Sequence, residues 1–440
     1  MLFLSTLFAV VDKKAYLCPL QMEKCMIDIV YKQREERDLL SMKPYVDRCQ
    51  SHDTRDVMQS PLIKLIVGPR RAGKSVYALQ LLKSKRFAYL NFDNEPLLER
   101  FDEDLVEQAL EEVYPQYEYL MLDEIQNLPS WDLWVSKLYR RGINIVMTGS
   151  NAKLLSSEMA TVLTGRYLMI EILPFSFQEV VTFNNLRLSG HTPTEKANTM
   201  LQLDDYLVYG GFPETLAMRS ITQNYLGSLF DSVLLKDVAK RFKVRHTTEL
   251  YKLASYLLVN YTNPVSYSTL VKELEMNSKI TCQKFVGYLT ETYMFHQLPR
   301  FDNKMRIMQK APFKMYVVDN GFISSRSFEL SPNKGRLLEN IVLVELMRRG
   351  YKPGLSLFYY RTRNDREIDF VCKQGHLVSA LVQVSYDTTQ GKTLSREITA
   401  LNEAAGELKC DKKLLLTVYP AMQEIEGVEI IPVMEWLLAK

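Results

Sequence analysis

A glycine-rich segment near residue 70 combines the residue types that bind phosphate. It reads GPRRAGKS over residues 68–75 and matches the pattern G-x-x-x-x-G-K-[ST]. Its two glycines let the backbone turn tightly and point N–H groups at phosphate oxygens, at a helix start where the dipole favours anions. Lys74 would reach the β- and γ-phosphates, and the Ser75 hydroxyl would complete a Mg²⁺ shell. The predicted nucleotide contacts are Gly68, Pro69, Arg70, Arg71, Ala72, Gly73, Lys74, Ser75 and Val76.

The surroundings of this segment favour a phosphate site over a glycine-rich turn that holds no ligand. The apolar run LIKLIVG over residues 62–68 predicts a buried strand before the loop, and SVYALQLLKS over residues 75–84 predicts a helix after it. Strand, loop and helix in this order are the context that the motif requires. The two arginines inside the loop, Arg70 and Arg71, would reach phosphate or form salt bridges close to it.

A pair of carboxylates follows a second apolar strand, YEYLML, and consists of Asp123 and Glu124. Asp123 would bind Mg²⁺ and Glu124 would polarise the attacking water as a general base. Acidic pairs at strand ends often only cap helices. Because this pair follows a phosphate loop and one intervening strand, we favour the catalytic interpretation.

Polar residues also end the next strand, residues 143–147, as the sequence TGSN. Ser150 is the favoured sensor of the γ-phosphate, and Asn151 is the alternative. Arg166 precedes the fifth strand and would donate charge to a γ-phosphate in its own chain or in a neighbouring subunit. The alternative is that Arg166 is an ordinary surface arginine.

Strand-like runs and amphipathic helical runs alternate from residue 62 to residue 173, which predicts a three-layer fold with a mostly parallel sheet. We expect a core with an N-terminal helix over residues 26–175 and a helical lid or linker over residues 176–247. A winged helix-turn-helix is predicted for residues 248–330, because three short helices precede a hairpin. A second α/β unit is predicted for residues 331–440. Residues 1–25 are interpreted as an extension, and a translation start at Met26 would account for them.

Composition favours an ordinary globular protein. The 440 residues are 47% hydrophobic and 24% charged, with a net charge of +3. The six cysteines are scattered without a CxxC pair, which predicts neither a zinc site nor a disulfide framework and fits a cytoplasmic setting. The apolar run of the first eleven residues is too short to span a bilayer, so no membrane association is expected. The pattern does not decide whether the chain forms an oligomer.

Several segments together resemble a known family. GPRRAGKS, YLMLDEIQNLPSWDLWVSKL, VMTGSNAKLLSSEMATVLTGRY, ILPFSFQEV and YLVYGGFPE occur in this order, and the chain is similar to AAA-like ATPases of the AAA_14 type with a C-terminal DUF4143 region. The resemblance covers nearly the whole chain from about Met26. It implies ATP rather than GTP as the cofactor, together with Mg²⁺, and a P-loop core of the additional-strand catalytic glutamate class. The extra strand at residues 87–93 agrees with that class.

The resemblance also implies a restriction-endonuclease-like fold, of the PD-(D/E)XK type, for residues 331–440. The equivalent positions here are Glu339, the segment Glu367-Ile368-Asp369, and Gln383-Val384-Ser385. Nuclease chemistry of this type needs carboxylates that hold Mg²⁺ and a lysine beside the attacking water. Ser385 occupies the lysine position, and Lys392 would have to substitute from elsewhere. We therefore expect a block that binds, docks or regulates and does not cleave.

The partner is left open between double-stranded DNA and a protein. Residues 231–314 contain fourteen Lys or Arg and seven Asp or Glu, a net charge of +7, which is the footprint of phosphate-backbone binding. A solvated face on a helical lid is the alternative. The candidate DNA contacts are Lys279, Thr281, Gln283, Lys284, Arg300, Lys304 and Arg306.

The favoured function is an ATPase that converts the state of its nucleotide into movement of the two later domains. One alternative is a DNA-binding regulator that holds ATP structurally and scarcely hydrolyses it. The other is an ATP-gated nuclease, which would depend on Asp369.

Overall fold

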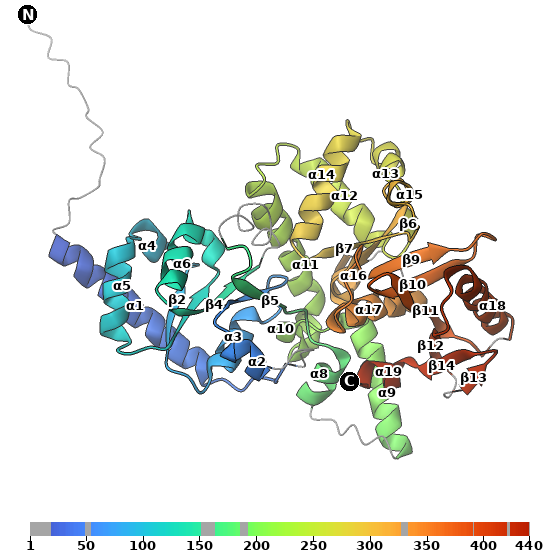
Figure 1. The fold of residues 1–440 in the computed structure, drawn as a ribbon, viewed down its shortest axis with the longest axis horizontal. Helices are drawn as coiled ribbons and strands as arrows, with labels where there is room; N and C mark the ends of the chain where they lie inside the picture. Colours follow the sequence, from blue (N-terminus) through green and yellow to red (C-terminus); the bar gives the residue numbers. More distant parts are fainter. Residues whose placement is uncertain are drawn as a thin grey trace, which may run out of the picture.

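The computed structural model describes residues 19–48, 54–150, 163–184, 192–326, 333–389, 391–419 and 423–439. Figure 1 shows an N-terminal core, built around one sheet, beside a larger body that contains the later helices and the other two sheets. Asn151 lies outside the described residues. Among the helices that are described, none combines the length and the apolar character needed to cross a membrane.

The N-terminal core contains a five-stranded sheet in the order β2-β3-β4-β1-β5, and every pairing in it is parallel. Its strands are β1 Ile63–Val67, β2 Phe87–Asn91, β3 Tyr119–Asp123, β4 Asn144–Gly149 and β5 Tyr167–Glu171. β1 and β3 are buried along their whole length, as expected for a sheet that is covered on both faces. The predicted three-layer parallel α/β fold is confirmed.

The two faces of this sheet are covered by different helices. Ile63, Leu65 and Val67 pack in one apolar cluster with α1 Pro19–Ser41, α5 Glu103–Val113 and α6 Trp131–Arg140. Ile66 points the other way and packs with α3 Lys74–Leu82 and α2 Thr54–Gln59. The alternation follows from the two-residue period of a strand. α4 Glu95–Glu99 and the short 3₁₀-helix Ile125–Asn127 complete the core.

The first described helix, α1, begins at Pro19, seven residues before the predicted start at Met26. Met26 itself is buried against the core. Gln33 fixes the helix to the edge strand β2, because its side-chain amide both donates to the Asn91 carbonyl and accepts from the Asn91 N–H.

A helical region follows the core. It consists of α8 Phe177–Phe183, α9 Pro193–Tyr209, α10 Pro213–Leu216, a 3₁₀-turn at Arg219–Ile221, α11 Thr222–Ser232 and the π-helix Val233–Lys240. The glycine pair before Phe212 is required by close packing: a Cβ on Gly211 would lie 2.2 Å from the Phe175 carbonyl oxygen. Gly210 has φ of +69°, and a Cβ there would lie 1.7 Å from Asp319 Oδ1.

Next comes a unit that we call the three-helix block. It contains α12 Thr247–Val259, β6 Pro264–Val265, α13 Tyr267–Glu273, α14 Lys279–Glu291, β7 Phe295–Pro299, α15 Met305–Met308 and β8 Phe313–Val317. The block is named after its three longer helices, α12, α13 and α14. The three strands form an antiparallel sheet in the order β6-β8-β7. α16 Asn320–Arg326 leads away from the block and packs against α11.

The C-terminal region is a second α/β unit, as predicted, with a mixed six-stranded sheet in the order β13-β14-β12-β11-β10-β9. Its elements are α17 Lys334–Arg348, β9 Leu357–Arg361, β10 Glu367–Gln374, β11 Leu377–Asp387, α18 Gly391–Leu408, β12 Lys413–Tyr419, β13 Gln423–Ile425, β14 Val428–Pro432 and α19 Val433–Leu438. One apolar cluster runs from Leu173 through the helical region and the three-helix block to Leu437. These three parts therefore share a core, whereas the N-terminal sheet has clusters of its own.

Candidate functional site

The phosphate loop lies at the carboxyl end of β1, where its backbone geometry depends on its two glycines. Gly73 has φ of +94° and caps the start of α3, and Arg71 is also left-handed, with φ of +68°. Gly68 touches the neighbouring strand segment, because a Cβ there would lie 2.0 Å from the Ile172 carbonyl oxygen. The glycine spacing that the motif requires is thus explained by packing and by left-handed backbone.

Lys74 is the buried cation of the site. Its side chain is 4% exposed, and its Nζ donates to the Pro69 carbonyl at 3.1 Å and lies 3.8 Å from Glu124 Oε1. Burial lowers the pKa of Lys74, and the charges of Glu124 and Asp123 oppose that effect. The ammonium is therefore held inside the loop next to the two carboxylates.

Asp123 and Ser75 meet across the gap between β3 and α3. The Ser75 hydroxyl donates to Asp123 Oδ1 at 2.8 Å, and Thr148 at the end of β4 donates to the same oxygen. Burial and then the charge of Glu124 raise the pKa of Asp123 to about 6. An alcohol and a carboxylate oxygen in contact are the ligand types that Mg²⁺ prefers, so these residues fit the ion that the motif implies.

Glu124 is held in a fixed position. Its backbone is left-handed, with φ of +51°, and its N–H donates to Thr148 Oγ1 at 3.0 Å. Ser150 donates to Glu124 Oε2 at 3.1 Å, and Gln126 donates to the same oxygen. Burial would raise the pKa of Glu124, but Lys74 and these hydrogen bonds outweigh burial and lower it. An ionised carboxylate beside Asp123 is suited to accept a proton from water.

The other two residues predicted at the γ-phosphate have different placements. Ser150 is buried and contacts Glu124, so it belongs to this group. Arg166 does not: it precedes β5, at the amino edge of the parallel sheet, opposite the loop. There it donates to Ser136 Oγ at 3.3 Å and lies over the Tyr139 ring. Action of Arg166 on the nucleotide of its own chain is therefore excluded by the strand direction, and action on a neighbouring subunit stays a prediction.

The arginines of the loop pair with the helical region. Arg70 contacts Asp237 of the π-helix through two atoms, with Nε to Oδ2 at 3.2 Å and Nη2 to Oδ1 at 3.3 Å. Arg71 lies 3.7 Å from Glu214 of α10. Both carboxylates come from the helical region, which places that region directly over the phosphate loop.

Arg48 contacts the phosphate loop and helps to fix its position. Sequence reasoning missed this residue because no motif surrounds it. Its guanidinium donates to the carbonyls of Ala72 and Leu173 and lies 3.2 Å from Glu179. Glu179 also closes the capping box with Ser176 at the start of α8. Arg48 thus connects the segment after α1, the phosphate loop and the helical region.

The nuclease-like positions of the C-terminal region form a second cluster, which contains an unexpected cation. Lys314 of β8 is 1% exposed, and its Nζ lies 2.9 Å from Glu339, 2.8 Å from Glu367 and 3.4 Å from Asp369. Tyr316 donates to Glu339 at 2.6 Å. The three-helix block therefore supplies the positive charge for carboxylates of the C-terminal region.

The remaining positions of that motif do not complete a nuclease centre. Gln383 donates to Glu397 at 2.9 Å and accepts from the Asp369 N–H. Ser385 donates to the Asp387 carbonyl, and Lys392 is exposed in the first turn of α18. Within the described part of the chain, no group of three acidic, His or Cys side chains has an arrangement suited to a metal ion.

The predicted DNA contacts lie on the three-helix block but differ in accessibility. Lys279, Gln283 and Lys284 of α14 are exposed, as are Lys304 and Arg306 around α15. Thr281 is half-buried. Arg300 is also half-buried, and it donates to the Arg361 carbonyl of β9. Arg300 therefore connects the three-helix block to the C-terminal region. Lys314, which is one of the fourteen cations counted in residues 231–314, is buried.

The sheet order, the loop after β1 and the carboxylates after β3 define the chain as a P-loop nucleotide-binding protein of the AAA type. Residues 60–181 match the AAA domain family, and residues 200–331 and 334–436 match two domains of unknown function, DUF8612 and DUF4143. The chain belongs to the AAA-domain family with a C-terminal DUF4143 region. The predicted family is thereby confirmed.

Two relatives cover most of the chain. An uncharacterized protein of Methanocaldococcus jannaschii is 33% identical over 398 residues, 86% of this chain and 88% of the relative. An uncharacterized protein of Haemophilus influenzae is 32% identical over 395 residues, 86% of this chain and 94% of the relative. A solved Walker-type ATPase of Pyrococcus abyssi is similar at 14% identity and a TM-score of 0.39, over 66% of this chain and 99% of that one.

Proposed function

We propose that this protein is a Mg²⁺-dependent ATPase in which hydrolysis changes the contact between the phosphate loop and the helical region. Backbone N–H groups of the loop and Lys74 would bind the phosphates, and Ser75 and Asp123 would hold Mg²⁺, which neutralises phosphate charge when bound. Glu124 would orient the attacking water and accept its proton. Ser150 would keep Glu124 in place.

The observation that carries the proposal is the arrangement of Ser75, Asp123 and Glu124. The Ser75 hydroxyl is 2.8 Å from Asp123, and the lowered pKa of Glu124 keeps the adjacent carboxylate ionised at neutral pH. A site that only stored ATP would have no need of an ionised base next to its Mg²⁺ ligand. This argument favours hydrolysis over the alternative of a regulator that holds ATP structurally.

Coupling to the helical region would run through Arg70. Its guanidinium is paired with Asp237, within the loop that phosphate would occupy. A phosphate group carries more charge than a carboxylate and accepts the same two-atom contact. ATP would therefore compete with Asp237 for Arg70, and loss of the γ-phosphate would return Arg70 to Asp237.

The three-helix block is proposed to act as a winged helix-turn-helix that responds to this movement, with double-stranded DNA or a protein as its partner. Five predicted contacts, Lys279, Gln283, Lys284, Lys304 and Arg306, are exposed there. Cleavage by the C-terminal region is not proposed. The ammonium of Lys314 already balances the carboxylates that nuclease chemistry would need for a metal ion.

The experiment that tests the function is ATP turnover by the full chain, with Mg²⁺, in the absence and presence of double-stranded DNA. We expect turnover that Lys74→Ala abolishes and that Lys137→Ala leaves unchanged, because Lys137 lies exposed on α6 and pairs with Glu103. Stimulation by DNA would identify DNA as the partner, whereas unchanged turnover would favour a protein. ATP binding without any turnover would overturn the ATPase assignment.

A further inference from the structure

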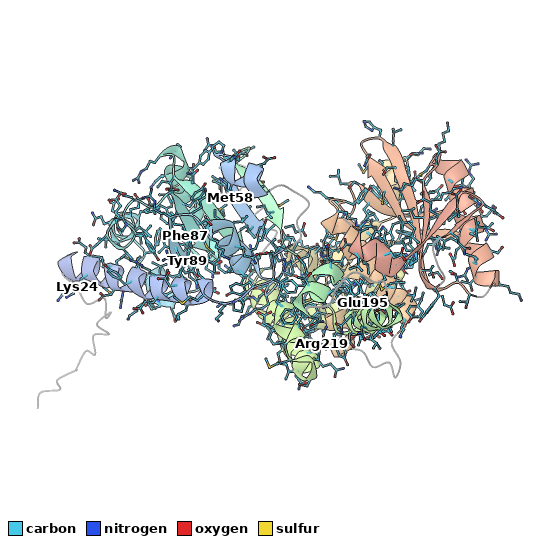
Figure 2. All side chains as sticks on the ribbon, turned by 90° about the horizontal axis from the view of Figure 1, so that it is seen from below. Lys24, Met58, Phe87, Tyr89, Glu195 and Arg219 are labelled. Atoms are coloured by element: carbon cyan, nitrogen blue, oxygen red, sulfur yellow. The ribbon has the colours of Figure 1, made fainter. Side chains whose placement is uncertain are left out.

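A second charged recess lies at the edge of the N-terminal sheet opposite the phosphate loop. We call it the basic cleft. It has a volume of about 780 Å³ and is bordered by the end of α1, the end of α3, the start of β2 and the residues before β3. Figure 2 shows Phe87 at this part of the core, next to α1 and away from Glu195 and Arg219 of the helical region. The cationic side chains in its lining are Arg34, Arg37, Lys43, Lys83, Lys85 and Arg86.

Most of this positive charge has no acidic partner. Arg37 pairs with Asp38, and Arg86 pairs with Glu118 at 2.7 Å. Asp47 is the other carboxylate in the lining. Lys43, Lys83 and Lys85 are exposed and form no salt bridge within the described residues. Three ammonium groups without an acidic partner around one recess favour an anionic ligand with several charges.

The arginines of the cleft stabilise its shape. Arg34 donates to the Val113 carbonyl at 2.9 Å, and Arg37 donates to the Phe87 carbonyl at 2.8 Å. The Arg37 guanidinium lies 5.0 Å from the ring centres of both Phe87 and Tyr114. Gln80 of α3 donates to the Val46 carbonyl and thereby fixes the segment after α1 along the rim. The recess is built by long-range contacts and is not a gap between loose side chains.

Aromatic residues line the same recess as Lys43, Lys83 and Lys85. Tyr45 and Tyr117 line the cleft and are half-buried. Rings next to lysines are the combination that binds single-stranded nucleic acid, in which phosphates contact cations and unpaired bases stack on aromatic faces. Bases within a duplex are stacked on each other and are not free to contact these rings.

We propose that the basic cleft binds a single-stranded nucleic acid, with Lys43, Lys83 and Lys85 on its phosphates and Tyr45 and Tyr117 on its bases. The site is separate from the ATP site, because it lies at the opposite ends of the same parallel strands. α3 joins the two sites: it begins at Lys74 in the phosphate loop and ends at Leu82 beside the cleft, about 14 Å away along a nine-residue helix.

The test is fluorescence anisotropy of a labelled oligodeoxythymidylate with the full chain at several salt concentrations. The cleft variant carries Lys43→Glu, Lys83→Glu and Lys85→Glu. A matched control variant carries Lys24→Glu, Lys409→Glu and Lys412→Glu, with the same change in charge, because these exposed lysines lie outside the cleft and outside the three-helix block. We expect the cleft variant to bind the oligonucleotide about tenfold or more weakly. The slope of the logarithm of the binding constant against the logarithm of the salt concentration should become shallower by about 2, at roughly 0.7 per lost phosphate contact. The control variant should stay near wild type.

Further variants distinguish specific binding of the oligonucleotide from a general effect of charge. Replacing the same three cleft lysines with Arg should preserve binding, and far-ultraviolet circular dichroism with thermal unfolding should show that every variant is folded. Tyr45→Ala with Tyr117→Ala should weaken the oligonucleotide and leave the affinity for inorganic polyphosphate unchanged. Equal losses in the cleft and control variants would overturn the proposal. So would a wild-type chain that binds polyphosphate and not the oligonucleotide, because the cleft would then recognise phosphate without nucleic-acid bases.

Discussion

Arg70 of the phosphate loop and Asp237 of the π-helix are 167 residues apart in the chain and form a two-atom ion pair, with distances of 3.2 and 3.3 Å. Their side chains are 31% and 17% exposed, so the pair is partly shielded from water. The only other ionic contact described between the loop and the helical region is that of Arg71 with Glu214. Of these two pairs formed by side chains of the loop, Arg70–Asp237 is the shorter and the less exposed.

Asp237→Asn should strengthen ATP binding, because it frees Arg70 for phosphate. We expect a two- to fivefold decrease in the ATP dissociation constant, as for a pair worth about 0.5–1 kcal/mol. The dissociation constant is measured by isothermal titration calorimetry with a non-hydrolysable ATP analogue. Asp231→Asn is the matched control, since Asp231 pairs with Arg326 and not with the loop. Weaker ATP binding in Asp237→Asn would contradict the competition between Asp237 and phosphate.

Glu124→Gln should lower ATP turnover by about 10²- to 10³-fold and leave ATP bound, because it removes the base and keeps the shape of the side chain. Steady-state phosphate release and nucleotide retention on the purified protein measure the two effects. Glu118→Gln is the control, because Glu118 pairs with Arg86 at the opposite edge of the sheet. Normal turnover in Glu124→Gln would remove Glu124 from the mechanism.

The Mg²⁺-dependent part of ATP affinity should fall as the pH drops below about 6. Burial and the charge of Glu124 raise the pKa of Asp123 from 3.8 to about 6, so protons compete with the metal ion below that value. The loss should approach tenfold per pH unit, because one proton is exchanged. Binding is measured between pH 5 and 8 with Mg²⁺ and, as the control, with EDTA. A pH profile that is identical in both would show that Asp123 does not hold the metal ion.

The raised pKa of Asp123 also makes the stability of the protein without nucleotide depend on pH. This stability should fall as the pH rises, whereas Mg²⁺-dependent ATP affinity should increase. The pKa of Asp123 is higher in the folded state than in the unfolded state, so the folded state binds the proton more tightly. Its stabilising contribution is present below about pH 4 and is lost as the pH rises through about 6. Mg²⁺ and ATP should therefore raise the melting temperature more at pH 8 than at pH 5.

Lys314→Met should lower the free energy of unfolding by about 3 kcal/mol or more, because it leaves Glu339, Glu367 and Asp369 without their shared cation. Guanidinium chloride unfolding measures the loss, and lower pH should recover part of it by protonating the carboxylates. Lys310→Met is the control, since Lys310 is exposed. Equal losses in the two variants would show that the Lys314 cluster is not what joins the three-helix block to the C-terminal region.

Local sequence was sufficient for the nucleotide site. The glycine spacing, the apolar strand before it and the carboxylates after residues 119–122 depend on neighbours within a few residues, so the phosphate loop, Asp123 and Glu124 could be placed at one edge of a parallel sheet. The position of Arg166 was also accessible from sequence. A residue that precedes a parallel strand lies at the edge opposite the loop, because all strands of such a sheet run in the same direction.

The tertiary structure decided which distant residues meet the site. Thr148 reaches Asp123 only because β4 pairs with β3, and Asp237 reaches Arg70 only because the helical region packs over the loop. Lys314 is one of the fourteen cations of residues 231–314 that suggested a basic surface. In the structure, β8 places it among three carboxylates of the C-terminal region. The motif determines local backbone geometry through residue type, whereas ion pairs between distant segments depend on packing that no local pattern encodes.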